Sequence, residues 1–128
     1  MDKKNILIAL GTIALVIIPI AIYGASKPSN VAPGKFDSFA QCLTDKGAKF
    51  YGAFWCSHCQ NQKKMFGDSF EKVNSIECST ADGKGQTAEC ADAKIEGYPT
   101  WEFADGTRQS GELSFEVLSQ KTGCGLPQ

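Results

Sequence analysis

The sequence lacks an excess of positive charge and has very little histidine. Its 128 residues contain 13 lysines and arginines against 14 aspartates and glutamates, for a formal net charge of -1, and a single histidine, His58. Proteins that bind nucleic acid usually present a strongly basic surface, so these numbers predict no nucleic-acid partner. The length is sufficient for one small domain with an appendage.

Motifs for nucleotides and metals are also missing or incomplete. No glycine-rich motif of the kind that holds a nucleotide or a flavin is present, so no bound cofactor is predicted. A structural zinc site needs two close pairs of ligands, and the sequence has one such pair, Cys56 and Cys59. A zinc-stabilised adaptor is therefore the less favoured interpretation, and chemistry at the two sulfur atoms is the main one.

Cysteine, in contrast, is abundant, with six in the chain. This content is typical of an oxidising compartment, in which disulfides persist. With the close pair set aside, the other four cysteines allow three pairings. We predict Cys78–Cys90, which would close a glycine-rich loop after a strand, and Cys42–Cys124, which would tie the first helix to the end of the chain. The second pairing requires the first and last helices to lie on the same side of the sheet.

The N-terminus contains one long apolar run. Residues 6–23 are eighteen residues without a charge, and Lys3 and Lys4 precede them. A helix of this length spans about 27 Å, close to the thickness of the hydrocarbon core of a bilayer. We expect residues 1–23 to form a cytoplasmic head and a single transmembrane anchor, with the rest of the chain outside. The alternative is a cleaved signal peptide, because residues 24–26 are small enough to permit cleavage.

The segment after the apolar run is predicted to be a flexible linker over residues 24–35, because Pro28, Pro33 and Gly34 interrupt regular structure. Residues 36–128 then form the domain proper. The predicted location is a cell membrane, crossed once, with this domain outside the cytoplasm in a periplasm, at a cell surface or in a lumen. The short linker would keep the domain close to the bilayer.

The domain alternates between helical and extended periodicity, which predicts an α/β fold with a mixed sheet. A loop is expected over 79–89 and a hairpin turn at 105–106. Helices are predicted over 36–46, from Cys56 to about 67, over 90–95 and over 114–122, and strands over 48–55, 73–78, 98–103 and 107–110.

The segment Trp55-Cys56-Ser57-His58-Cys59 lies at a predicted strand-to-helix junction. Two cysteines three residues apart can close a small reversible disulfide. The first turn of a helix offers unpaired N–H groups and the positive end of the helix dipole, which favour a thiolate at Cys56. His58 would add a donor and partial positive charge beside that thiolate, and its alternative role is an exposed helix residue. Trp55 is either a lid over the site or part of the core.

This segment together with Tyr98-Pro99-Thr100 resembles the thioredoxin superfamily over about residues 36–124. With Trp101 and the Glu-Cys elements at 77–78 and 89–90, the chain is similar to thioredoxin-like domains associated with bacterial and plant vitamin K epoxide reductase homologues. The resemblance implies a mixed four-stranded sheet flanked by helices. It also implies three roles: Cys56 as the exposed nucleophile, Cys59 as the resolving thiol and Pro99 as a cis-proline facing the pair.

These features together predict a membrane-tethered thiol–disulfide oxidoreductase that promotes disulfide formation in exported proteins. Its expected partners are exported substrate proteins with cysteines and, as the resemblance implies, a membrane-embedded vitamin K epoxide reductase homologue that accepts the electrons. Phe50 occupies the position, six residues before the first cysteine, where reducing thioredoxins often carry a buried carboxylate. The alternatives are a disulfide reductase or isomerase of the thioredoxin type and a non-catalytic thioredoxin-like binding module.

Overall fold

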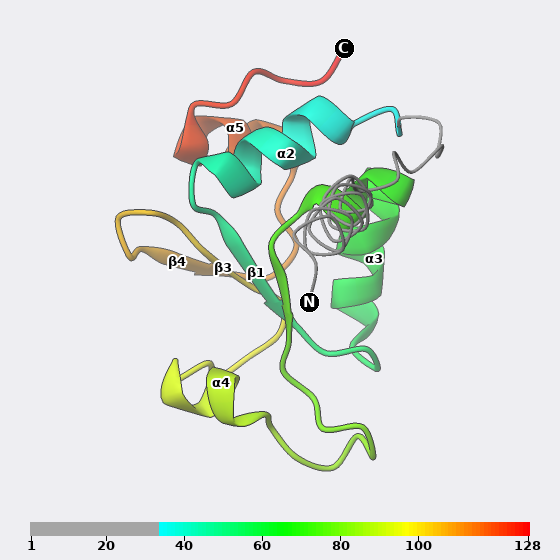
Figure 1. Cartoon of the computed structure of the whole chain (residues 1–128), viewed down its shortest axis with the longest axis vertical. Helices are drawn as coiled ribbons and strands as arrows, with labels where there is room; N and C mark the ends of the chain where they lie inside the picture. The colour runs from blue at the N-terminus through cyan, green and yellow to red at the C-terminus, as the bar shows by residue number, and fades with distance from the viewer. Residues whose placement is uncertain (1–33) are drawn as a thin grey trace, which may run out of the picture. The chain divides into compact units, whose positions relative to one another are not determined.

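The computed structural model describes residues 34–128 (Figure 1). The predicted anchor, residues 1–23, and nearly all of the predicted linker, residues 24–35, lie outside the described residues, so both stay predictions. Within residues 34–128, no helix has the length and apolar character that crossing a membrane requires.

Four short strands form one mixed sheet in the order β2-β1-β3-β4. Strand β1 pairs in parallel with β2 and antiparallel with β3, and β3 pairs antiparallel with β4. The predicted α/β fold with a mixed four-stranded sheet is therefore confirmed. The strands are β1 (Lys49–Gly52), β2 (Ser75–Glu77), β3 (Thr100–Glu102) and β4 (Arg108–Ser110).

Four helices and one 3-10 helix accompany the sheet in the described part of the chain. Figure 1 shows α2 and α5 together at one end of the domain, α3 along its side, and α4 with its long preceding loop at the other end. The helices are α2 (Asp37–Asp45), α3 (Ser57–Phe66), α4 (Ala88–Asp92) and α5 (Phe115–Thr122), and the 3-10 helix is η1 (Gly67–Lys72).

The core consists of two clusters because successive side chains of a strand point to opposite faces of the sheet. Phe50 of β1 belongs to the larger cluster, where its ring meets the ring of Trp101 at 5.1 Å, edge to face, and both residues are fully buried. The next residue, Tyr51, belongs to the smaller cluster, with Ile95 and the Cys78–Cys90 disulfide. Burial of large aromatic rings, at roughly 25 cal/mol per Å² of apolar surface, is the main stabilising contribution to this core.

The two scaffold disulfides have the pairing chosen from the sequence. Cys42 on α2 joins Cys124, just after α5, with a Cα–Cα distance of 6.0 Å. The two helices therefore lie on the same side, as that pairing required. Cys78, just after β2, joins Cys90 on α4 with a Cα–Cα distance of 5.4 Å, which closes the loop 79–89 at its base.

Several helices and strands are shorter in the structure than the sequence predicted. The strand predicted over 48–55 ends at Gly52, because the chain turns at Ala53, whose carbonyl oxygen accepts the N–H of Cys56 at 3.0 Å. The helix predicted from Cys56 begins one residue later. The strands predicted over 73–78 and 98–103 shorten to three residues each, and the helix predicted over 90–95 is α4, residues 88–92. The ends of these strands and helices depend on hydrogen bonding between strands and on the packing of loops. The local periodicity of the sequence does not predict them.

Candidate active site

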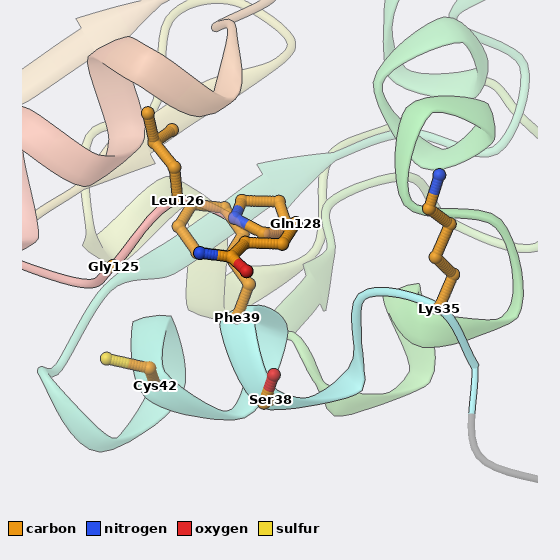
Figure 2. A pocket seen from close by; sticks show the side chains of 8 residues that line it. Lys35, Ser38, Phe39, Cys42, Gly125, Leu126 and Gln128 are labelled. Carbon is orange, nitrogen blue, oxygen red and sulfur yellow. The ribbon is translucent and has the colours of Figure 1, made fainter.

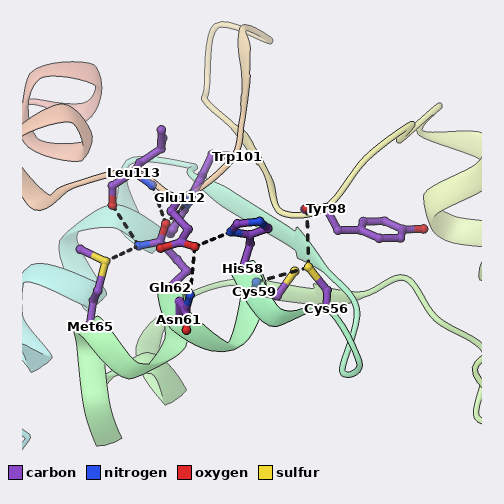
Figure 3. Close-up of polar contacts among 10 residues, drawn as sticks. All are labelled: Cys56, His58, Cys59, Asn61, Gln62, Met65, Tyr98, Trp101, Glu112 and Leu113. Atoms are coloured by element: carbon purple, nitrogen blue, oxygen red, sulfur yellow. Dashed lines mark hydrogen bonds and ion pairs between the residues drawn. The ribbon is translucent and has the colours of Figure 1, made fainter.

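Cys56 is the N-cap residue of α3 and has an extended backbone, with φ -77° and ψ 119°. Its Sγ accepts the backbone N–H of Cys59 at 3.3 Å, so the sulfur satisfies one of the free donors at the start of the helix (Figure 3). In the thiol form, Cys56 also donates to the carbonyl oxygen of Tyr98 at 3.6 Å. A thiolate at this position would gain the N–H contact and the favourable end of the helix dipole.

The partner sulfur lies one helical turn deeper. Cys59 has no exposed surface, and burial, aided by its hydrogen bond to Cys56, raises the pKa of its thiol to about 12. A Cβ atom on Gly52 would lie 3.2 Å from this Sγ and 2.6 Å from the Phe50 ring, so only glycine permits the close approach of β1. Cys59 therefore stays protonated at neutral pH, whereas Cys56 occupies the anion-favouring position.

The expectation of an exposed Cys56 needs correction. Only 8 % of the residue is accessible to solvent, compared with 0 % for Cys59. The Tyr98 carbonyl oxygen lies 3.6 Å from the Cys56 sulfur, and the backbone N–H of Cys56 donates to the Ala53 carbonyl oxygen. Cys56 is thus the more accessible of the two residues, although it is buried.

His58 lies between the two cysteines in the sequence, but its side chain contacts Glu112 and neither sulfur atom. Its Nδ1 is 2.6 Å from Oε1 of Glu112, which also accepts a hydrogen bond from the Asn61 side chain at 3.2 Å (Figure 3). The His58 side chain is 70 % exposed. The hydrogen bond from His58 lowers the pKa of the Glu112 carboxyl group. Sequence reasoning missed Glu112, because no motif or spacing connects a loop residue to a position 54 residues earlier.

Pro99 belongs to the segment that contacts Cys56 through the Tyr98 carbonyl group. The Tyr98–Pro99 peptide bond is cis, and Pro99 is fully buried. The carbonyl group of Tyr98 contacts Cys56, so the structure brings this segment to the reactive sulfur. The Pro99 carbonyl oxygen accepts the N–H of Gly111 at 2.8 Å, which ties the segment to the chain after β4.

Trp55 is not part of the core, contrary to one of its two predicted roles. It is 53 % exposed, and its neighbour Phe54 is 48 % exposed. The Trp55 ring meets the Tyr98 ring edge to face at 6.0 Å, and its Nε1–H donates to Ser79 Oγ at 2.9 Å. The sequence offers no signal for Ser79, which lies in a polar loop typical of solvent-exposed turns.

Gln62 is a buried polar residue under the site. Its Oε1 accepts the backbone N–H of Leu113 at 2.7 Å and the indole N–H of Trp101 at 3.3 Å, and its Nε2 donates back to the Leu113 carbonyl at 3.0 Å. These bonds join α3 to the segment before α5. The buried polar side chains of residues 34–128 are Gln62, Ser69, Ser79 and Thr100. None of the four is a carboxylate that could accept the proton of Cys59.

The pocket shown in Figure 2 lies away from these residues, between α2 and the C-terminal residues 125–128. It has a volume of about 520 Å³, and its lining includes Lys35 and Cys42 but neither Cys56 nor Cys59. In the described range, no group of three histidine, cysteine or acidic residues is placed to hold a metal ion. The candidate site is therefore the sulfur pair and its immediate neighbours.

Two comparisons with known proteins cover the residues of this candidate site. The thioredoxin family model covers residues 31–120, a range that includes Cys56, Cys59 and Pro99. The chain is also 41% identical over 122 residues to thiol-disulfide oxidoreductase LTO1 of Arabidopsis thaliana. That match covers 92% of this chain but 31% of the relative, so the chain spans about a third of the length of the curated protein it matches.

Proposed function

The chain belongs to the thioredoxin family, and from this premise we propose that it is a thiol–disulfide oxidoreductase of the Cys-x-x-Cys type that acts as an oxidant. In this proposal it forms disulfides in exported proteins while tethered to a membrane by residues 6–23. Membership of the thioredoxin family was predicted from the sequence and is confirmed, and the activity itself is part of the proposal. The direction of electron flow, the substrates and the location are the proposal.

The observation that carries the proposal is the asymmetry of the two sulfur atoms. Cys56 caps α3 and accepts the Cys59 N–H, whereas Cys59 is fully buried and has its pKa raised to about 12. Groups that stabilise the Cys56 thiolate stabilise the reduced form of the pair. A stabilised reduced form makes the Cys56–Cys59 disulfide a stronger oxidant.

The reaction follows from these positions. A substrate thiolate attacks Cys56 Sγ of the disulfide, the Cys56–Cys59 bond breaks, and Cys59 leaves with the electron pair and takes up a proton. The second substrate thiolate then attacks the substrate sulfur of the mixed disulfide and releases Cys56 as a thiolate. Two electrons pass from the substrate to the pair, and the substrate gains one disulfide. Because Cys59 holds its proton at neutral pH, it attacks the mixed disulfide only slowly, which leaves time for the second step.

The same feature disfavours a reductase. A thioredoxin-type reductant needs its second cysteine to lose a proton and resolve the mixed disulfide with its target. Phe50 fills the position at which a carboxylate would assist, and no buried carboxylate replaces it within residues 34–128. Resolution by Cys59 is therefore expected to be slow unless a partner supplies a proton acceptor.

Repeated turnover requires an electron acceptor. The sequence has no flavin or nucleotide motif and no second Cys-x-x-Cys, so the acceptor in our proposal is a separate protein. The resemblance to domains associated with vitamin K epoxide reductase homologues supports a membrane-embedded enzyme of that type. A membrane tether would raise the local concentration of the domain near such a partner.

The proposed function is tested with the oxidised full chain in mild detergent and a reduced, unfolded protein that contains two cysteines. We expect the substrate to lose its free thiols and the chain to gain two, and Cys56→Ser to abolish both changes while circular dichroism shows a retained fold. Zinc analysis of the same preparation tests the adaptor alternative. A chain that reduces disulfides but does not accept electrons from thiols would contradict the proposal.

A second experiment addresses the partner. Cys59→Ser removes the resolving thiol, so a mixed disulfide between Cys56 and the electron acceptor should accumulate in membranes. We expect a covalent adduct with a vitamin K epoxide reductase homologue that disappears on reduction, and no adduct with Cys56→Ser. Capture of soluble exported proteins alone, together with re-oxidation that needs no quinone-linked enzyme, would contradict this part of the proposal.

A further inference from the structure

The base of the loop 79–89 contains two polar residues that face each other. Ser79 and Gln86 are partners in an isolated antiparallel β-bridge, directly inside the Cys78–Cys90 disulfide. The backbone N–H of Thr80 donates to the carbonyl of Gly85 at 3.0 Å, one step further along the loop. The disulfide and these backbone contacts fix the spacing between Ser79 and Gln86.

Each of the two residues holds the side chain of one aromatic residue whose backbone adjoins Cys56. Ser79 Oγ accepts the indole N–H of Trp55 at 2.9 Å, and the Gln86 side-chain amide donates to the Tyr98 hydroxyl oxygen at 2.8 Å. The two aromatic rings meet edge to face at 6.0 Å. The four residues therefore form a closed ring of contacts: Trp55 to Ser79, Ser79 to Gln86 through the backbone bridge, Gln86 to Tyr98, and Tyr98 back to Trp55.

The two polar residues are themselves fixed by the protein. Ser79 is almost fully buried, its N–H donates to Glu77 Oε1 at 2.9 Å, and the same oxygen accepts the N–H of Phe54 at 3.2 Å. The Gln86 amide donates to the carbonyl oxygen of Ile95 at 2.7 Å as well as to Tyr98. These contacts fix the backbone of Ser79 and give the Gln86 amide a second acceptor besides Tyr98.

The ring of contacts adjoins Cys56 on two sides. Trp55 precedes Cys56 in the chain and is half exposed, and the carbonyl group of Tyr98 lies 3.6 Å from Cys56 Sγ. Cys56 itself is mostly buried, so a polypeptide that reaches its sulfur must fit against the surrounding surface, which includes the half-exposed Trp55. A small dithiol has no such requirement.

We propose that Ser79 and Gln86 are positioning residues, which hold Trp55 and Tyr98 as one wall beside Cys56 against which a polypeptide substrate lies. The Cys78–Cys90 disulfide then has a second role besides stability, because it sets the distance between the two residues that hold the wall. The inference rests on the proposed function, in which the substrate is a polypeptide with a pair of thiols.

The test compares two reductants of the Cys56–Cys59 disulfide in the oxidised full chain. One is dithiothreitol, which becomes a cyclic disulfide as the pair gains two electrons and two protons. The other is a twelve-residue peptide with two cysteines and neutral flanking residues, which becomes a cyclic disulfide in the same way. Ser79→Ala and Gln86→Met each remove a hydrogen bond to one aromatic residue. Thr87→Val is the matched control, because Thr87 donates to the Glu77 carbonyl oxygen in the same loop and contacts neither aromatic ring.

We expect Ser79→Ala and Gln86→Met to lower the second-order rate with the peptide by about fivefold or more, through a higher KM. The rate with dithiothreitol and the reduction potential should stay unchanged, and Thr87→Val should change neither rate. Equal losses with both reductants, or unchanged peptide rates in folded variants, would overturn the inference. A wild-type chain that accepts electrons from neither reductant would instead overturn the proposed function.

Fluorescence supplies a readout that is independent of catalysis. Trp55 is half exposed and Trp101 is fully buried, so quenching by acrylamide reports mainly on Trp55. Ser79→Ala should increase this quenching because the indole N–H loses its partner, and Thr87→Val should leave it unchanged. Identical quenching in wild type and Ser79→Ala would show that Ser79 does not hold Trp55, and the inference would fail.

Discussion

The Nδ1 atom of His58 lies 2.6 Å from Oε1 of Glu112, so the histidine between the two reactive cysteines is held by the segment before α5. Glu112 also accepts a hydrogen bond from Asn61, one turn further along α3. Together these contacts fasten the exposed side of the reactive helix to a part of the chain far away in sequence. His58 makes no direct hydrogen bond to the sulfur of Cys56, so an effect of His58 on Cys56 would act through space from its place at the start of the helix.

His58→Ala should make the Cys56–Cys59 disulfide less oxidising, because the thiolate loses partial positive charge beside it. A loss of about 1 kcal/mol corresponds to roughly 20 mV for this two-electron couple. The measurement is the reduction potential by equilibration with glutathione. Asn61→Ala is the control, since it removes the other hydrogen bond to Glu112 and leaves His58 in place. An unchanged potential in His58→Ala would mean that His58 is only a surface residue.

Resolution of a mixed disulfide by Cys59 should accelerate with pH up to at least pH 9 without a plateau. Burial raises the pKa of Cys59 to about 12 in the reduced protein. In the mixed disulfide the contribution from Cys56 is absent, but the burial that is the largest cause persists. Below the pKa the thiolate fraction grows about tenfold per pH unit, and the rate should follow it. The chain is loaded with glutathione at Cys56, and glutathione release is followed between pH 6 and 9. A plateau near pH 7 would show that Cys59 ionises readily.

Gly52→Ala should destabilise the fold by about 1–3 kcal/mol, because the added Cβ would lie 2.6 Å from the Phe50 ring and 3.2 Å from Cys59 Sγ. Urea unfolding of the reduced protein measures the change. Gly97→Ala is the matched control, since no atom lies within 4 Å of its added Cβ, and it should change stability by less than about 0.5 kcal/mol. Equal effects of the two variants would count against the close packing of β1 on the Cys59 sulfur.

Removal of each scaffold disulfide should destabilise the domain, and the loss should be larger for the disulfide that closes the longer loop. The chain-entropy relation gives upper values of about 3 kcal/mol for Cys78–Cys90 and about 4.5 kcal/mol for Cys42–Cys124. Paired Cys→Ser variants and urea unfolding provide the numbers, and peptide mapping without reduction verifies the pairing. A free thiol at Cys42 or Cys124 in the native protein would contradict the second disulfide.

Short-range signals in the sequence predicted the position of the cysteine pair well. Cys56 and Cys59 were placed at a strand-to-helix junction because a buried apolar run meets a helical pattern there, and a local pattern is enough for that inference. The mixed sheet and both scaffold pairings were also predicted, since few arrangements suit so small a domain with four remaining cysteines.

Features that depend on tertiary contact were not predictable in this way. Glu112 reaches His58 across 54 residues, and Ser79 and Gln86 lie in a polar loop whose composition suggests only solvent exposure. The end of β1 at Gly52 follows from its pairing with β2, which no single segment encodes. The contact between Cys56 and the Tyr98 carbonyl group likewise joins positions 42 residues apart in the chain.

The reduction potential of the Cys56–Cys59 pair tests the central claim most directly. The full chain in mild detergent is equilibrated with defined ratios of reduced and oxidised glutathione, and the fraction of alkylated Cys56 is determined by mass spectrometry. An oxidant of exported proteins should have a potential between about -200 and -120 mV, well above the value near -270 mV typical of thioredoxin. A potential at or below about -270 mV would contradict the account, because the pair would then donate electrons to substrate disulfides.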